Sequence, residues 1–175
     1  MPVIPYKNLT AHISSTVFIA PNAWVTGQVY IEDDVSIFFG AVLRGDLEKI
    51  YVGAGTNIQE NALLHTSHGL ADCMVGRNVT VGHSAIVHGC TIKDNCIIGM
   101  GSTLLDGAII GENCIVGAQA LVPMNMIVPP GSLVLGVPAK VARRLEPAEI
   151  KSIAESASHY VETGREYKRY FEAAK

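Results

Sequence analysis

Charged and aromatic side chains are scarce in this chain of 175 residues: 17% of the positions are Asp, Glu, Lys or Arg, and 6% are Phe, Trp or Tyr. With 49% hydrophobic residues, the chain is too rich in aliphatic side chains for a disordered protein. Its net charge of −3 argues against a nucleic-acid partner. No apolar run reaches the length of about 18 residues that a membrane span needs, so we expect no membrane association.

Signals for export and for cysteine-based zinc binding are also missing. The first residues, Met1–Lys7, lack a charged start followed by a long apolar stretch, so we expect no secretory signal. The four cysteines form no C-x-x-C pair and no zinc-ribbon spacing. We therefore expect reduced thiols and a cytoplasmic location.

What the chain does have is an aliphatic residue that recurs every six positions. A helix would repeat every 3.6 residues and an ordinary strand every two, so this period indicates the hexapeptide repeat of a parallel β-helix. The position four residues after each aliphatic residue, or anchor, is mostly small, as a narrow interior requires. The anchors are Ile19, Val25, Ile31, Ile37, Leu43, Val52, Ile58, Leu64, Val75, Val81, Val87, Ile92, Ile98, Leu104, Ile110, Val116, Val122, Val128 and Val134.

These anchors predict an all-β solenoid in residues 1–145, a three-sided prism of about six coils with one hexapeptide on each side. From Pro147 the apolar spacing becomes helical, which predicts a C-terminal α-helix within residues 146–175. A single helix is not stable alone, so it should pack along the outside of the prism or against a partner chain.

Counting the sides of the prism through the anchors places the histidines. His65 and His83 are 18 residues apart and would stack, but the long segment 66–74 breaks the register. Leu64 and Val87 share one side in successive coils, so His65 and His88, which directly follow them, form an outward column. Arg44 belongs to the same column one coil earlier.

His83 falls on a different side from the other two histidines, near Gln59. Three imidazoles with water would make a tetrahedral catalytic zinc site. If His65, His88 and His83 bind one metal, His83 must come from a neighbouring copy, as in a trimer with three sites at its interfaces. The alternative is that these are surface histidines or histidines satisfied in an interface.

Several polar residues near this column have two interpretations each. Arg44 and Asp46 could pair within one chain or between subunits, and we favour the pair between subunits. Gln59 could orient a metal-bound water or be an ordinary polar interface residue.

Asn57 and Asn61 are expected at corners, because Asn tolerates turn geometry. Two thiols 18 residues apart should stack inside the prism as small hydrophobic groups without a redox role: Cys96 and Cys114.

The chain resembles the γ-class carbonic anhydrases and their close relatives over nearly its whole length. The motifs that carry the resemblance are Val42-Leu43-Arg44-Gly45-Asp46, Asn57-Ile58-Gln59-Glu60-Asn61, Leu64-His65, Val81-Gly82-His83, His88-Gly89-Cys90-Thr91-Ile92 and Gly136-Val137-Pro138-Ala139-Lys140. The hexapeptide repeat itself is shared with many acyltransferases. The three histidines together with the Arg-Gly-Asp and Asn-Ile-Gln-Glu motifs are specific.

The resemblance implies a left-handed β-helix that forms a homotrimer with zinc, or alternatively iron or cobalt, at each interface. The implied metal ligands are His65 and His88 of one subunit and His83 of the next. It further implies reversible hydration of CO2 to bicarbonate by metal-bound hydroxide. It also implies an ion pair between subunits, a glutamine near the metal-bound water and a tyrosine near the site: Arg44 with Asp46, Gln59 and Tyr160.

One expected feature of that family is missing. An acidic loop with a glutamate proton shuttle would follow His65, but this chain has only residues 66–72 there. His68 in this loop either replaces the shuttle, since imidazole titrates near neutrality, or is a solvated loop histidine. Other functions also stay open: a hexapeptide acyltransferase, a metal-dependent acyl-CoA thioesterase, or a non-catalytic trimer held together by metal.

Overall fold

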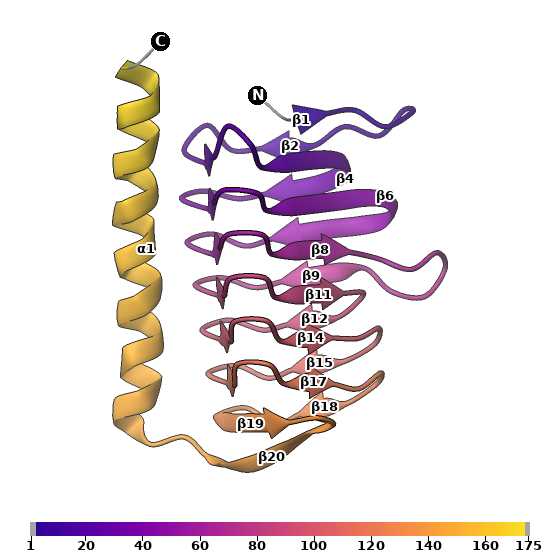
Figure 1. Cartoon of the computed structure of the whole chain (residues 1–175), viewed down its shortest axis with the longest axis vertical. Helices are drawn as coiled ribbons and strands as arrows, with labels where there is room; N and C mark the ends of the chain where they lie inside the picture. The colour runs from indigo at the N-terminus through magenta and orange to yellow at the C-terminus, as the bar shows by residue number, and fades with distance from the viewer. Residues whose placement is uncertain (1–2, 174–175) are drawn as a thin grey trace.

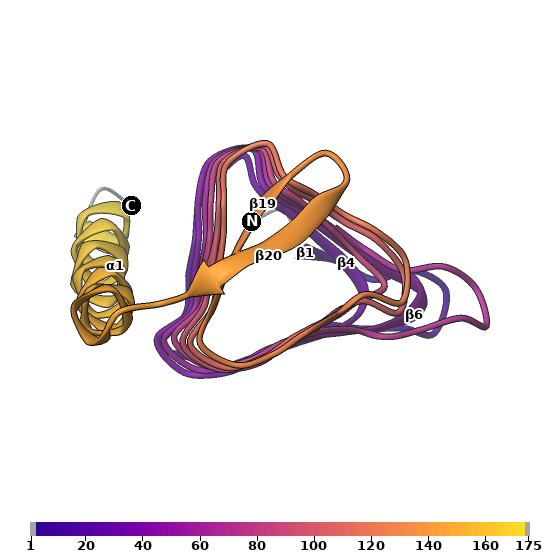
Figure 2. The same ribbon diagram turned by 90° about the horizontal axis from the view of Figure 1, so that it is seen from below.

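The computed structural model describes residues 3–173, whose backbone coils into a three-sided prism with one helix beside it (Figures 1 and 2). The chain crosses the front of the prism to the right and returns behind it as it descends, so the coil is left-handed (Figure 1). The predicted parallel β-helix with a C-terminal helix is thus confirmed. Residues 1–2 and 174–175, the outer ends of the two predicted segments, lie outside the described residues.

Two adjoining faces of the prism form one continuous sheet. Face 1 contains, coil by coil, β1 (Val3–Ile4), β4 (Trp24–Ile31), β6 (Val42–Val52), β8 (Leu63–His65), β11 (Ile86–His88), β14 (Thr103–Leu104) and β17 (Leu121–Val122). Both β4 and β6 continue around the edge, where their pairing shifts register. Face 2 therefore consists of their second halves together with β2 (His12–Ile13), β9 (Cys73–Val75), β12 (Thr91–Ile92), β15 (Ile109–Ile110) and β18 (Ile127–Val128).

Face 3 is a separate parallel sheet that ends in one antiparallel strand. Its strands are β3 (Phe18–Ile19), β5 (Ser36–Ile37), β7 (Asn57–Ile58), β10 (Thr80–Val81), β13 (Ile97–Ile98), β16 (Ile115–Val116), β19 (Ser132–Gly136) and β20 (Ala139–Arg144). The last of them, β20, pairs antiparallel with β19 and so ends the stack of parallel strands at its final coil.

Seven strand levels stack on each face, one more than the predicted six coils. The additional coil comes from β1 and β2, which pair with β4 in parallel register. Its inward residues, Val3 and Ile13, are ten positions apart rather than six, because a turn with a bridge between Tyr6 and Leu9 separates them. The six-residue period therefore misses this coil.

The anchors fill the interior of the prism, where Leu43, Leu64 and Val87 are fully buried. The small residues between them are buried as well, and so are the Cys96 and Cys114 thiols, as the sequence predicts. Backbone with positive φ turns the corners. At one corner Asn61, with φ of 59°, places its side-chain oxygen where a Cβ on Gly40 would lie, so glycine is required in the preceding coil.

Helix α1 (Pro147–Ala173) packs lengthwise on Face 3, against β3, β5, β7 and β10 (Figures 1 and 2). The helix thus lies along the outside of the prism. The helix buries Ile153, Ala157 and Gly164, and its aromatic rings pack on Phe18 and Phe38. Within residues 3–173, no helix is both long enough and apolar enough to cross a membrane.

Candidate metal centre

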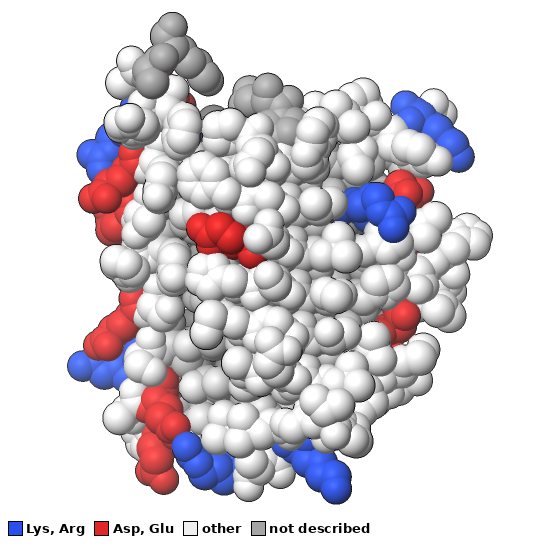
Figure 3. Space-filling model, in the orientation of Figure 1, with Lys and Arg blue, Asp and Glu red and all other residues white. Residues whose placement is uncertain are grey.

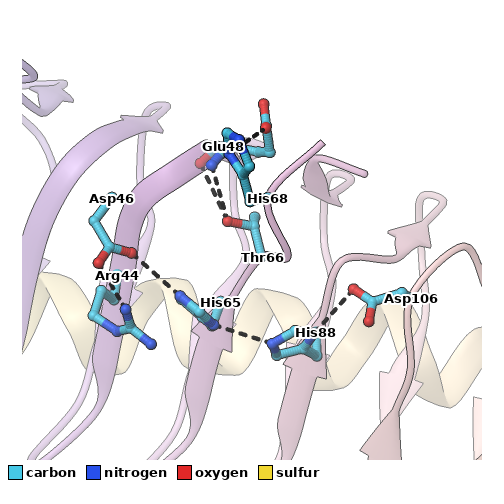
Figure 4. A network of polar contacts seen from close by, with 8 residues as sticks. All are labelled: Arg44, Asp46, Glu48, His65, Thr66, His68, His88 and Asp106. Carbon is cyan, nitrogen blue, oxygen red and sulfur yellow. Dashed lines mark hydrogen bonds and ion pairs between the residues drawn. The ribbon is translucent and has the colours of Figure 1, made fainter. Parts of the chain in front are cut away.

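The predicted histidine column lies on Face 1. His65 ends β8, His88 ends β11, and the two residues are directly paired across the parallel ladder. Their side chains leave the prism side by side, with ring centroids 5.0 Å apart (Figure 4). The Nδ1 atom of His65 faces the Nε2 atom of His88 at 3.0 Å. The parallel register thus places two ring nitrogens in close contact, as counting through the anchors predicts.

Each of these two rings also bonds a carboxylate through its outer nitrogen. Asp46 Oδ1 lies 3.2 Å from His65 Nε2, and Asp106 Oδ1 lies 3.0 Å from His88 Nδ1. The carboxylates flank the pair in a line that runs across four neighbouring coils, those of β6, β8, β11 and β14 (Figure 4). An ionised carboxylate only accepts hydrogen bonds, so the outer nitrogen of each ring must carry a proton.

The two inner nitrogens therefore face each other with lone pairs when the rings are neutral. Burial, together with the charge of Arg44, lowers the pKa of His65 from its ordinary value and so favours the neutral ring. Two facing lone pairs repel each other unless a cation lies between them. On a tetrahedral zinc ion, two imidazole nitrogens at about 2.0–2.1 Å from the metal are roughly 3.3 Å apart. The observed separation of 3.0 Å is close to that, so this donor pair fits a metal ion.

Arg44 and Asp46 pair within one chain, where the sequence analysis favoured a pair between subunits. Arg44 Nη1 donates to Asp46 Oδ2 at 2.7 Å, because residues two apart on β6 point to the same side. Burial acts to raise the pKa of Asp46, but hydrogen bonds from Arg44 and His65 bring it below its ordinary value. Asp46 thus stays ionised and connects the arginine to the histidine column.

His83 lies apart from this pair, at the corner between β10 and β11. Its Nδ1 atom is 2.6 Å from Glu60 Oε2, which leaves Nε2 free for another partner. Within residues 3–173, no three side chains of His, Cys, Asp or Glu converge in the arrangement of a metal site. One chain therefore holds two of the three predicted ligands together and presents the third elsewhere, as expected if the site is completed by a neighbouring copy.

Gln59 and Tyr160 lie on the His83 side of the molecule. Both line the same open cleft of about 390 Å³ as His83, between Face 3 and helix α1. The ring of Tyr160 packs edge-on against Phe38, with centroids 5.9 Å apart. Gln59, Tyr160 and His83 therefore line one cleft, whereas the histidine pair lies on Face 1, outside that cleft.

Asn57 was expected at a corner, and that expectation is wrong. It lies buried in β7, where its amide donates to Thr80 Oγ1 at 2.9 Å and accepts from Gln59 Nε2 at 3.1 Å. Gln59 is only 4% exposed, so this buried chain of hydrogen bonds fixes the direction of its amide group. Asn61, by contrast, occupies a corner with positive φ as predicted.

His68 lies in the loop between β8 and β9 and is largely exposed. Its Nδ1 atom is 3.7 Å from Glu48 Oε1, and the same carboxylate accepts the backbone N–H of Gly69 at 2.8 Å. Thr66 Oγ1 accepts the backbone N–H of Glu48 at 3.1 Å, which anchors the start of the loop to β6 (Figure 4). An imidazole and a carboxylate thus stand together at the surface beside the histidine pair.

Three residues of the site were not predicted in these roles from the sequence: Asn57, Glu60 and Asp106. Asp106 follows His88 by 18 residues, but the coil between them has only 17, because Val87 pairs with Leu104. Asp106 therefore lies one position past the residue that is level with His88, and counting along the repeat does not identify it. Glu60 follows Gln59 directly, but it reaches His83 across a corner whose shape the repeat does not specify.

Comparisons with known proteins agree with this architecture. The family model described as bacterial transferase hexapeptide (six repeats) matches residues 89–123. Gamma carbonic anhydrase 2 of Arabidopsis thaliana mitochondria is 46% identical over 154 residues, which are 85% of this chain and 55% of that protein. A carbonic anhydrase of Geobacillus kaustophilus is 42% identical over 166 residues, which are 95% of this chain and 91% of that protein.

A solved structure matches equally broadly. A Bacillus cereus protein, provisionally described as an acetyltransferase, superposes with a TM-score of 0.93 at 40% identity and covers 96% of this chain and 97% of that one. The chain spans about half the length of the Arabidopsis relative and nearly all of the Geobacillus one. On these similarities the chain belongs to the γ-class carbonic anhydrase family of hexapeptide-repeat proteins.

Proposed function

We propose that this protein is a γ-type carbonic anhydrase that reversibly hydrates CO2 to bicarbonate at a metal ion shared between subunits. The observation that carries the proposal is the pair of ring nitrogens on His65 and His88. They face each other at 3.0 Å, while their outer nitrogens are bonded to carboxylates. A cation between the two nitrogens would offset the repulsion of their lone pairs. The reaction is proposed because relatives of this chain are named carbonic anhydrases.

The third ligand in this proposal is His83 of a second subunit. Its Nδ1 atom is bonded to Glu60, and its half-exposed ring does not converge with the histidine pair of its own chain within residues 3–173. Three imidazoles are a ligand set for zinc, with iron or cobalt as alternatives. The chain would therefore act as a homotrimer with one site at each of three interfaces.

The surface around the histidine pair supports such an interface. Successive side chains next to the histidine column on Face 1 are almost all apolar: Trp24, Val42, Leu63, Ile86, Thr103 and Leu121. The strands β8, β11, β14 and β17 lie on the side facing the viewer in Figure 1, and the same side in Figure 3 carries its charges mainly around the margins. An apolar sheet face of this size favours burial against another subunit.

Zinc bound by three imidazoles lowers the pKa of a coordinated water to about 7. The residues of this chain then have separate tasks. Asp46 and Arg44 hold His65, and Asn57 holds the amide of Gln59, which would hydrogen-bond a reactant near His83 of the same subunit. Tyr160 closes one wall of that cleft.

A proton must leave the site in every turnover, and His68 with Glu48 is the route we propose. The two side chains are 3.7 Å apart at the surface beside the histidine pair. An imidazole exchanges protons with solvent near neutral pH. This pair would stand in for the acidic loop that the chain lacks.

The test is stopped-flow CO2 hydration on protein loaded separately with zinc, ferrous iron and cobalt. We expect hydration with at least one metal and its loss in His83→Ala. Protein that binds the metal but hydrates no CO2 would contradict the proposal. Acyl-thioester hydrolysis, acyl transfer and a purely structural trimer would then be the functions to examine.

Mixed trimers test the shared site directly. His83→Ala keeps the histidine pair, and His88→Ala keeps His83. Trimers reassembled from both variants would regain an intact site wherever a His83→Ala subunit presents its pair to a His88→Ala neighbour. We expect activity in the mixture and none in either variant alone. Inactive mixed trimers of normal assembly would contradict a site built from two subunits.

A further inference from the structure

The carboxylate of Asp106 contacts His88, the second histidine of the column. It lies in the turn between β14 and β15, one coil beyond His88. Its Oδ1 atom is 3.0 Å from His88 Nδ1, and its Oδ2 atom is 3.3 Å from the hydroxyl of Ser67. Its side chain is 15% exposed, against 25% for His88. The carboxylate is thus largely withdrawn from water and has a separate partner for each oxygen.

The backbone leaves room for this contact at Gly89. A Cβ atom on Gly89 would overlap the Oδ1 atom of Asp106, and φ at this glycine is +51°, a conformation that side chains disfavour. The His88-Gly89 pair therefore places the imidazole and clears the space for the carboxylate that holds it. Ser67 fixes the other side of the same carboxylate, from the loop that contains His68.

We infer that Asp106 is a positioning residue that fixes the ring orientation and tautomer of His88. Its carboxylate accepts the Nδ1 proton, so the lone pair of the neutral ring lies on Nε2, the atom that faces His65. This inference rests on the proposed function only in treating His88 as a metal ligand. Carboxylates of this kind typically change metal affinity about 10–100-fold.

A second corner aspartate provides a matched control. Asp94 also places its Oδ1 atom beside a glycine of the preceding coil, in this case Gly76. Its carboxylate, however, accepts from the backbone N–H and guanidinium of Arg77, at 2.8 Å and 2.9 Å, and contacts no histidine. Asp94→Asn therefore changes the same residue type at a similar turn without touching the histidine pair.

The first measurement needs no metal. Histidine ring-nitrogen NMR on the metal-free protein, at a mildly alkaline pH where the rings are neutral, reports which nitrogen carries the proton. The His88 signals are assigned by their loss in His88→Gln. We expect the Nδ1–H form in the wild type and in Asp94→Asn, and a shift toward the Nε2–H form in Asp106→Ala. A wild-type ring protonated on Nε2, or an unchanged tautomer in Asp106→Ala, would overturn the inference.

The second measurement is zinc affinity by competition with a chelator, together with the visible spectrum of the cobalt-loaded protein. We expect Asp106→Asn and Asp106→Ala to weaken zinc binding by about 10–100-fold and to alter the cobalt spectrum. Asp94→Asn should match the wild type. Equal zinc affinity in all variants would refute the positioning role. Failure of the wild type to bind any metal would refute the proposed function instead, while the tautomer measurement still decides the role of Asp106.

Discussion

At the scale of single residues, each of the three imidazoles of the site already has one ring nitrogen bonded to a carboxylate. Asp46 holds His65, Asp106 holds His88 and Glu60 holds His83, each through one ring nitrogen. Each carboxylate belongs to a segment distant in sequence from its histidine, or across a corner from it. The donor atoms are therefore oriented before any ligand binds, which lowers the entropic cost of binding.

We predict that His83→Ala abolishes metal binding without disturbing the coils. The ring is nearly half exposed, and among residues 3–173 its one ionic partner is Glu60, itself 39% exposed. Loss of such a surface pair costs about 0–1 kcal/mol of folding free energy. Metal titration and circular dichroism of the same samples check this. An unfolded or insoluble variant would show that His83 does not have this exposed position.

At the scale of elements, helix α1 is attached to the prism by close contact as well as by aromatic packing. Gly164 lies so near Face 3 that a Cβ atom there would be 2.8 Å from the Cβ atom of Ser36. A glycine in mid-helix is unfavourable by about 1 kcal/mol relative to alanine. The close approach of helix to sheet explains why it is nevertheless present.

We predict that Gly164→Val destabilises the protein by about 1–3 kcal/mol, the usual cost of overpacking. Ala154→Val, at an exposed position of the same helix, should cost only the small difference in helix propensity. Urea unfolding of both variants measures the comparison. Equal stability of the two would mean that the helix moves away from Face 3 at little cost.

The start of α1 gives a pH-dependent prediction. Arg143, through hydrogen bonds to the carboxylate, and the backbone N–H of Glu146 lower the pKa of Glu149 to about 2. Because the folded value lies below the unfolded value of 4.5, the contribution of Glu149 is complete above that value and disappears as the pH falls toward 2.

Glu149→Gln should therefore lower the thermal midpoint at neutral pH, and the difference from the wild type should shrink as the pH falls below 4.5 and vanish only below about pH 2. The effect is modest, because the group is exposed to solvent. Glu155→Gln, which removes an exposed pair with Lys151, is the control and should change the midpoint less. A pH-independent difference for Glu149→Gln would contradict the explanation.

At the scale of the whole molecule, the faces of the prism differ in what covers them. Helix α1 covers Face 3, whereas Face 1 presents its apolar column beside the histidine pair. The stack of coils is held by inward aliphatic columns, so substitutions on an outer face should change assembly more than folding.

We predict that Ile86→Lys on Face 1 dissociates the proposed trimer and reduces metal binding with it. Ile109→Lys on Face 2 is the matched control, because Ile86 and Ile109 are similarly exposed in the chain, at 36% and 38%. Light scattering after size exclusion measures the mass of each variant. A trimer that survives Ile86→Lys but not Ile109→Lys would place the subunit interface on Face 2.

The six-residue period is enough to predict the solenoid, because each hexapeptide directs one large aliphatic anchor into the interior of the three-sided coil. It also determined the stacking of His65 on His88, since both directly follow anchors that share a face. The spacing between Met1 and Ile19 does not repeat, so the first coil was missed.

Which polar side chains bond one another, in contrast, follows from the folded structure and not from the repeat. Asp46 bonds both Arg44 and His65 within one chain, Asn57 turns inward to hold Gln59, and Glu60 reaches His83 around a corner. A repeat specifies which side chains point outward, because that follows from backbone register. It does not specify which of several outward neighbours a flexible side chain bonds, because that depends on the shape of corners and loops that have no period.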